Sequence, residues 1–307
     1  MTPGVLILTG PTASGKSALA LDLAERFDAE IVGADSRQIY RGMPIGTAAP
    51  SPIELARVRH HLVGVLDPLE RYSAARFVAD ALAAIDDIHA RGRHAIVAGG
   101  TGFYVRALAG DVALSPAYDP ALRERIAREA RTHPPDVLAG WLGALAPARA
   151  SAIAPNDPYR VARALEIALA ERAGGRARDA EGAPTLRTRG IAYRKIALEV
   201  PREELARRVE RRVDAMLAAG FVDEAERIGA AVVAADAVGY REALAYLAGF
   251  STRAELRAHL IRNTMRYAKR QATWFRTEPG LVRIDAADAA DARTRAAAEA
   301  GALPGWA

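Results

Sequence analysis

The chain reads Gly10-Pro11-Thr12-Ala13-Ser14-Gly15-Lys16-Ser17 near its beginning, which fits the phosphate-binding pattern G-x-x-x-x-G-K-[ST]. The apolar run 5–8 before it predicts a buried strand, and residues 18–26 after it predict a helix. In such a loop, the backbone N–H groups and the start of the helix surround a phosphate group. The stretch therefore predicts an α/β fold, with a parallel sheet core flanked by helices.

The side chains of this loop suit a charged phosphate ligand. Lys16 would place a positive charge on a terminal phosphate, and the Ser17 hydroxyl would be a ligand for Mg²⁺, the cofactor that we expect. The alternative is a chance turn rich in glycine and serine, which the flanking strand and helix argue against. The loop alone does not indicate which phosphate compound is bound or what reaction it undergoes.

Two further polar residues follow predicted strands. The predicted strand 30–34 is followed by Asp35, and the predicted strand 95–98 is followed by a glycine-rich turn that contains Thr101. Because the carboxyl ends of parallel strands meet at one edge of a sheet, we expect both residues to face the phosphate loop. A carboxylate that accepts a proton and a hydroxyl that bonds a leaving phosphate suit a transferase better than a hydrolase. The alternatives are an N-cap role for Asp35 and a structural role for Thr101.

Six segments, in order along the chain, carry a resemblance to a known family. They are residues 10–17, 35–40 with 42–47, 99–104, 156–160 with 163–166, 239–241 and 269–274. In these segments the chain resembles the bacterial tRNA dimethylallyltransferases, also called tRNA isopentenyltransferases. The resemblance implies transfer of the dimethylallyl group of dimethylallyl diphosphate to the exocyclic N6 amine of the adenosine at tRNA position 37, with release of diphosphate.

The resemblance also implies roles for individual residues. Asp35 would be the catalytic base, and Thr101 and Lys16 would assist the departure of diphosphate. The diphosphate would be bound by residues 10–17 and by Arg212, with Mg²⁺ at Ser17. Contacts with the tRNA anticodon stem-loop are implied for Asp35, Ser36, Arg37, Gln38, Thr101, Arg123, Tyr159, Arg160, Arg163, Arg241, Lys269, Arg270, Gln271 and Trp274.

The middle of the chain changes character and predicts a second, smaller domain. Proline-rich breaks separate expected helices at about 120–131, 137–145 and 158–172, with Asp157 as the N-cap of the last one. We therefore expect a P-loop NTPase-like catalytic core made of residues 1–110 and 189–307, and a small all-helical insertion at 111–188. In the family that the chain resembles, such an insertion contacts tRNA.

Basic residues gather late in the chain. Arg262, Arg266, Lys269 and Arg270 are spaced so that they lie near one another on a helix. Such a helix could bind RNA phosphates, with aromatic residues available for stacking. The alternative is a solvated basic face with its aromatic residues in the core. Under either reading, Tyr267 and Phe275 are expected in the core. The alanine- and aspartate-rich stretch 285–301 predicts a peripheral helix or a frayed tail.

Composition indicates in which compartment the protein is expected and which kinds of site it lacks. The 307 residues carry a formal net charge of +5 and include no cysteine, so neither disulfides nor a cysteine metal site is expected. The six histidines lack metal-ligand spacing, and His60 and His61 are expected to be structural or exposed. The first residues contain no basic leader, and no apolar run is long enough to span a bilayer. We expect a cytoplasmic protein without a membrane segment, and nothing indicates more than a monomer.

Two other functional classes fit part of the sequence. A P-loop small-molecule or nucleotide kinase would share the phosphate loop and a base after the second strand, and would turn over ATP or GTP without RNA. An arginine-rich lid of the kinase kind is not evident, although residues 123–131 could imitate one. A non-catalytic RNA-binding protein with a decayed loop is the third reading, and the intact Lys16, Ser17, Asp35 and Thr101 argue against it.

Overall fold

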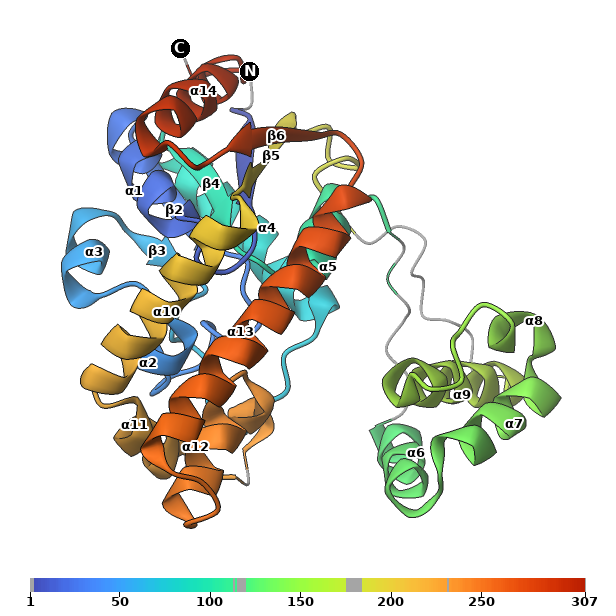
Figure 1. Ribbon diagram of the computed structural model, residues 1–307. Helices are drawn as coiled ribbons and strands as arrows, with labels where there is room; N and C mark the ends of the chain where they lie inside the picture. Colours follow the sequence, from blue (N-terminus) through green and yellow to red (C-terminus); the bar gives the residue numbers. More distant parts are fainter. Residues whose placement is uncertain (1–2, 113, 115–119, 175–183, 231, 307) are drawn as a thin grey trace. The chain divides into compact units, whose positions relative to one another are not determined.

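The computed structural model in Figure 1 describes residues 3–112, 114, 120–174, 184–230 and 232–306. The chain divides into two compact units, Met1–Val112 with Pro184–Ala307, and Ala113–Ala183. We call them the core unit and the inserted unit. The predicted insertion at 111–188 was too long at both ends. Leu186 N donates a hydrogen bond to Leu108 O at 2.9 Å, and this bond joins the returning chain to the core unit.

The described part of the core unit contains a six-stranded sheet whose strands pair in the order β3-β2-β4-β1-β5-β6. Every pairing is parallel, as predicted. The strands are β1 (Val5–Thr9), β2 (Ala29–Gly33), β3 (His60–His61), β4 (His94–Ala98), β5 (Tyr193–Glu199) and β6 (Leu281–Asp285). β1 and β2 are buried at every position, because a parallel sheet has helices on both faces and needs apolar side chains on both.

Helices surround this sheet (Figure 1). They are α1 (Lys16–Arg26), α2 (Pro44–Thr47), α3 (Pro52–Arg57), α4 (Ala74–Ala90), α5 (Gly102–Ala109), α10 (Arg202–Ala218), α11 (Phe221–Ile228), the 3-10 helix η1 (Val233–Asp236), α12 (Tyr240–Leu247), α13 (Arg253–Arg276) and α14 (Ala289–Gly301). α10 lies beside α13, and α1 lies beside α14. Among the described residues, we find no helix with the length and apolar character needed to cross a membrane.

The alanine-rich C-terminal stretch forms an ordered part of the core, so the alternative of a frayed tail is excluded. Ala292, Ala296 and Ala300 of α14 are buried in the same apolar cluster as Leu6 of β1. Small side chains let the helix approach the sheet closely. Trp306 follows the helix, is 2 % exposed, and donates its indole N–H to Gly4 O at 2.9 Å. The C-terminal segment is therefore tied to the start of β1.

The described part of the inserted unit is helical, as predicted. It contains α6 (Pro120–Thr132), α7 (Pro135–Leu145), α8 (Pro147–Ala150) and α9 (Pro158–Arg172). Its own apolar cluster includes Ile126, Leu142 and Leu165, one from each of the three longer helices. Asp157 caps α9 as expected, because its Oδ1 accepts a hydrogen bond from Arg160 N at 3.1 Å.

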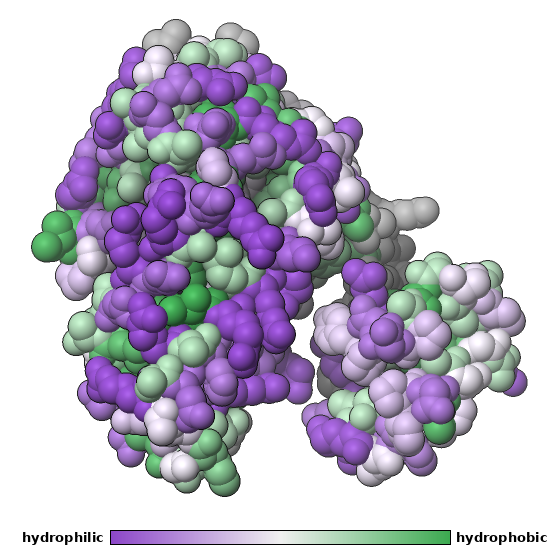
Figure 2. All heavy atoms as spheres, viewed as in Figure 1, coloured by the Kyte–Doolittle hydropathy of each residue, from purple (hydrophilic) through white to green (hydrophobic). Residues whose placement is uncertain are grey.

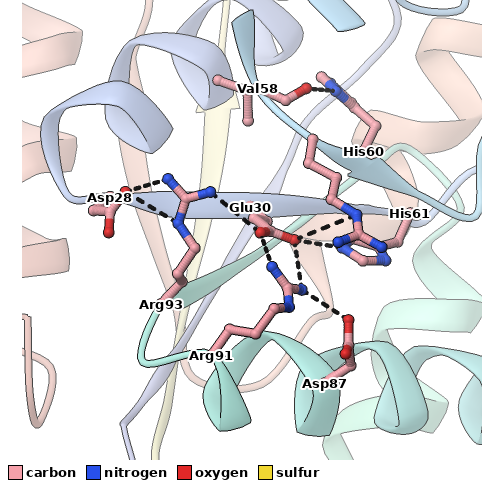
Figure 3. Close-up of polar contacts among 9 residues, drawn as sticks. Asp28, Glu30, Val58, His60, His61, Asp87, Arg91 and Arg93 are labelled. Carbon is pink, nitrogen blue, oxygen red and sulfur yellow. Dashed lines mark hydrogen bonds and ion pairs between the residues drawn. The ribbon is translucent and has the colours of Figure 1, made fainter. Parts of the chain in front are cut away.

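A buried carboxylate organises the amino-terminal end of β2 (Figure 3). Glu30 has 1 % of its side chain exposed and accepts hydrogen bonds from Arg91 and Arg93. His61 Nε2 lies 2.7 Å from Glu30 Oε2, so this histidine has a structural role, one of the two outcomes expected for it. His60 Nδ1 contacts Val58 O at 2.8 Å. The described residues contain no group of three or more His, Cys, Asp or Glu side chains arranged to hold a metal ion.

Candidate active site at the carboxyl edge of the sheet

The phosphate loop connects β1 to α1 at the carboxyl edge of the sheet. Lys16 is the first residue of α1, and its Nζ donates to Pro11 O at 3.4 Å. The Ser14 hydroxyl is buried and has no hydrogen-bond partner among the described residues. A buried hydroxyl without a partner is costly, and a phosphate oxygen bound in the loop would satisfy it. The loop therefore fits a phosphate ligand in its side chains as well as in its backbone.

Two side chains from distant helices hold the phosphate loop in place. Gln271 of α13 accepts a hydrogen bond from Thr12 N at 2.8 Å and donates to Gly100 O at 3.0 Å. Arg208 of α10 donates to Ser14 O at 3.2 Å. Sequence reasoning missed Arg208, because nothing local distinguishes it from the other arginines of its helix.

The loops after β2 and β4 contact each other directly. Ser36 N donates to Thr101 Oγ1 at 3.0 Å, and Thr101 N donates to Ala34 O at 3.2 Å. Gly99 permits this approach, since a Cβ at that position would lie 2.1 Å from Ala34 O. Asp35 and Thr101, which the sequence placed at neighbouring strand ends, are brought together by this contact.

The two carboxylate oxygens of Asp35 have different surroundings. Oδ1 accepts hydrogen bonds from Arg37 N at 2.9 Å and Gln38 N at 3.3 Å, so it caps the following turn. Oδ2 accepts no hydrogen bond from any described residue. One oxygen therefore has the structural role that was the alternative for Asp35, while the other is available to accept a proton.

Asp35 shares its electrostatic environment with two cations and a phenol. Burial lowers the pKa of Lys16 to about 8, with Asp35 acting to raise this pKa and Arg212 acting to lower it. Burial also lowers the pKa of Arg212, against the opposing effect of Asp35. For Tyr267, burial raises the pKa and Asp35 raises it further. Tyr267 was expected in the core, but it is only half-buried and lies near the site, whereas Phe275 is buried as predicted.

Gln38 is held in one orientation by backbone carbonyl groups. Its Nε2 donates to Thr47 O at 3.1 Å and to Ala48 O at 2.9 Å. The neighbouring Arg37 forms an ion pair with Asp236 at 2.7 Å. Gln38 thus presents its oxygen, Oε1, as the polar atom that remains unpaired within the described residues.

The residues of α13 that were predicted to contact tRNA fall into two groups. Lys269 and Arg270 are exposed, and Figure 2 shows hydrophilic side chains over much of the visible face formed by α10 and α13. Gln271 departs from the expectation, because it is 5 % exposed and both ends of its amide bind within the protein. Trp274 is half-buried against Gly102 with the Arg106 guanidinium 4.5 Å from its ring centroid. Arg241 is exposed.

In the inserted unit, one buried carboxylate organises two of the predicted RNA-contacting arginines. Glu166 is 4 % exposed and pairs with Arg123 at 3.4 Å and with Arg163 at 2.5 Å. Tyr159 is 78 % exposed, and Arg160 is exposed beside Asp157 at 3.3 Å. Glu166 therefore holds Arg123 and Arg163, while Tyr159 and Arg160 lie exposed on α9, the helix that carries Arg163.

The residues beside the loop would fit a Mg²⁺ ion held mainly by a phosphate ligand. Ser17 is exposed in the first turn of α1, where its hydroxyl can serve as one ligand. In proteins Mg²⁺ commonly keeps several waters and binds substrate phosphates together with one or two protein oxygens. A single hydroxyl beside a phosphate loop matches that mode of binding.

Comparison with known proteins shows the family of the chain. The family described as IPP transferase matches residues 38–278. This chain belongs to the IPP transferase family. A relative named tRNA dimethylallyltransferase from Geobacter sulfurreducens is 42% identical over 282 residues, covering 90% of each chain.

Solved structures of this family have the same fold. The tRNA isopentenylpyrophosphate transferase of Bacillus halodurans matches with a TM-score of 0.69 and 35% identity, over 96% of this chain and 95% of that one. A eukaryotic dimethylallyltransferase, described as acting on tRNA, matches with a TM-score of 0.76 and 26% identity, over 95% of this chain and 77% of that one.

Proposed function

We propose that this protein transfers the dimethylallyl group of dimethylallyl diphosphate to the N6 amine of the adenosine at tRNA position 37 and releases diphosphate. The observation that carries the proposal is Asp35 Oδ2, which has no hydrogen-bond partner among the described residues and lies in the electrostatic neighbourhood of Lys16 and Arg212. A base and cations at one phosphate loop suit proton removal from an acceptor while an anionic group departs. Many relatives carry the name of this activity.

On the donor side, the C–O bond to diphosphate breaks and negative charge accumulates on the leaving group. Lys16 and Arg212 are the cations near the loop that would stabilise this charge. The Thr101 hydroxyl accepts from Ser36 N and still has its own hydrogen to donate to a diphosphate oxygen. Ser17 would hold Mg²⁺, which would supply further positive charge beside the diphosphate when bound.

On the acceptor side, the amine nitrogen forms the new N–C bond and gives one proton to Asp35. A positioned base of this kind contributes roughly 10²–10⁴-fold in rate. The adenosine must leave its stack to reach the carboxylate, which costs a few kcal/mol. The exposed Lys269 and Arg270 of the core unit, and the cations of the inserted unit, suit the phosphate contacts that hold the RNA during this step. Because the acceptor is tRNA, the proposal includes a cytoplasmic location.

The test is transfer of label from dimethylallyl diphosphate to unmodified tRNA in the presence of Mg²⁺. We expect labelled RNA from the native protein, and a roughly 10²–10⁴-fold lower rate for Asp35→Asn with donor affinity nearly unchanged. The matched control is Asp285→Asn, since Asp285 also ends a strand and caps a turn, through Ala287 N at 2.8 Å. The absence of transfer, together with RNA-independent consumption of ATP, would support the kinase instead.

A further inference from the structure

Glu224 is a buried carboxylate that the proposed mechanism does not use. It lies on α11, is 0 % exposed, and has no cation paired with it among the described residues. Its oxygens accept hydrogen bonds from Ile45 N at 2.8 Å, Gly46 N at 2.8 Å and the Tyr240 hydroxyl at 2.7 Å. A buried charge is tolerated only when such partners satisfy it. Glu224 is therefore fitted to the backbone of one particular segment, residues 43–48.

That segment is also packed without spare room. A Cβ on Gly46 would lie 2.4 Å from the Phe221 ring and 2.6 Å from the Tyr240 oxygen. The rings of Phe221 and Tyr240 meet edge to face, with their centroids 5.2 Å apart. Burial, together with Glu224, raises the pKa of the Tyr240 hydroxyl, so it remains protonated and donates at physiological pH. The segment is held from one side by a ring pair and a carboxylate.

The carbonyl groups of the same segment hold two residues of the candidate active site. Thr47 O and Ala48 O accept both hydrogens of the Gln38 amide, and Thr47 O also lies 3.5 Å from Arg212 Nη2. Because both partners of the Gln38 amide nitrogen are acceptors, the amide cannot rotate by half a turn without placing its oxygen against two carbonyls. The orientation of Gln38 therefore depends on where residues 43–48 sit.

We propose that Glu224 and Tyr240 are positioning residues for the adenine base of the acceptor, acting through segment 43–48 on Gln38. This proposal rests on the proposed function. It gives a role to the Gly239-Tyr240-Arg241 motif that sequence reasoning singled out but did not explain. Tyr240 and Glu224 do not touch the reacting atoms. They keep Gln38 Oε1 available as a hydrogen-bond acceptor for the adenine base. Gln38 is three residues along the chain from Asp35.

The least disruptive test removes a single hydroxyl. Tyr240→Phe keeps the ring that packs on Gly46 and loses the hydrogen bond to Glu224. Its matched control is Tyr72→Phe, since the half-buried Tyr72 hydroxyl donates to Asp80 at 2.9 Å and not to Glu224. We expect about a tenfold lower kcat/KM for tRNA in Tyr240→Phe, a donor Kd within about twofold of the native value, and native kinetics in Tyr72→Phe. All assays run well below the Tm of each variant.

A double-mutant cycle tests whether the effect of Glu224 on tRNA turnover depends on Gln38. Glu224→Gln replaces one acceptor by an amide N–H that faces a backbone N–H, so residues 43–48 lose a hydrogen bond. We expect this change to lower kcat/KM for tRNA in the native background and to have much less effect in a Gln38→Ala background, because the group it positions is already absent.

The outcomes separate the two proposals. Native protein that transfers no label would overturn the proposed function. Native protein that transfers label, with Tyr240→Phe no slower than Tyr72→Phe, would overturn the positioning role alone. Additive effects of Glu224→Gln and Gln38→Ala, or an equal loss of donor and tRNA affinity in Tyr240→Phe, would also overturn it, since a general loss of structure predicts those results.

Discussion

At the scale of single residues, the chemistry of the candidate site depends on which side-chain atoms already have a hydrogen-bond partner. Asp35 illustrates this, because one oxygen caps a turn while the other is unpaired in the described part of the chain. The sequence offered a structural and a catalytic reading as alternatives, and the geometry allows both at once. Gln38 follows the same principle, since its nitrogen is used by two carbonyls and its oxygen is left as an acceptor.

Lys16 provides a prediction about pH. Its pKa is lowered to about 8 by burial, so the donor-free loop loses its charge as the pH rises through that value. The protonated form binds diphosphate better, so donor affinity should be constant below about pH 7 and fall above about pH 8, approaching tenfold per pH unit. Calorimetric titration of dimethylallyl diphosphate from about pH 6 to 9.5 measures this. Lys16→Met should bind weakly and without this pH dependence, and an equal slope in that variant would contradict the assignment.

At the scale of elements, α13 contributes to two different parts of the site. Neighbouring positions on its surface differ in burial, because consecutive helical residues point about 100° apart. Lys269 and Arg270 face solvent, whereas Gln271 faces the phosphate loop and the turn after β4. The same helix therefore presents basic side chains to solvent on one side and contacts the phosphate loop on the other.

Replacing Gln271 should affect the donor more than the RNA. Gln271→Ala leaves Thr12 N and Gly100 O without their buried partner, which costs about 1–3 kcal/mol. We expect a higher KM for dimethylallyl diphosphate and a lower Tm. Gln271→Glu is the informative second variant, because it retains an acceptor for Thr12 N but repels Gly100 O, and so should be intermediate. A change confined to tRNA binding would instead favour a direct RNA contact.

Neutralising Lys269 and Arg270 together should affect tRNA binding more than donor binding. Each lost phosphate contact reduces the dependence of tRNA affinity on salt by about one unit of log–log slope, so we expect a slope smaller by about two. The KM for tRNA should rise while the KM for the donor stays near the native value. Filter binding of tRNA over a range of KCl concentrations provides the measurement. An unchanged salt slope would remove these two residues from the RNA interface.

At the scale of the whole molecule, the candidate site and the ion network around Glu30 lie at opposite ends of the strands. The carboxyl edge holds the phosphate loop, Asp35 and Thr101, while the amino-terminal end of β2 holds the ion network around Glu30 (Figure 3). Changes at Glu30 should therefore alter stability with little effect on the kinetics of the folded protein.

Glu30 should stabilise the fold in a pH-dependent way. The hydrogen bond from Arg91 lowers the pKa of Glu30 to about 2, against the opposing effect of burial and with a further contribution from His61. Its contribution is present above the unfolded pKa of 4.5 and is lost as the pH falls toward 2. We expect Glu30→Gln to lose about 1.5–3 kcal/mol near pH 7 and to approach the native stability near pH 2.

Urea unfolding at several pH values would measure this. The control is Glu25→Gln, because Glu25 pairs with Arg57 at the surface, where both side chains are more than two-fifths exposed, and should change stability little. A difference between Glu30→Gln and native protein that is the same at low and neutral pH would show that the carboxylate charge is not responsible.

The sequence by itself determined the parts that depend on local pattern. The loop 10–17, the apolar strands around it, the helical character of the insertion and the cap at Asp157 all follow from spacing and side-chain type over short stretches. The short β3 and the edge strand β6 were not predicted, because two histidines and a half-exposed run carry little strand signal.

Tertiary structure decided which side chains support the site. Arg208, Glu224 and Gln271 reach loops between 171 and 259 residues away in the chain. Nothing local marks Arg208 and Glu224 among similar charged residues, and the segment 269–274 indicated a tRNA contact for Gln271 rather than its contact with the phosphate loop. The same holds for Tyr267, whose place near Asp35 follows from the packing of α13. A motif can specify the loop that binds a phosphate, but only folding brings together the distant groups that satisfy its backbone and orient its neighbours.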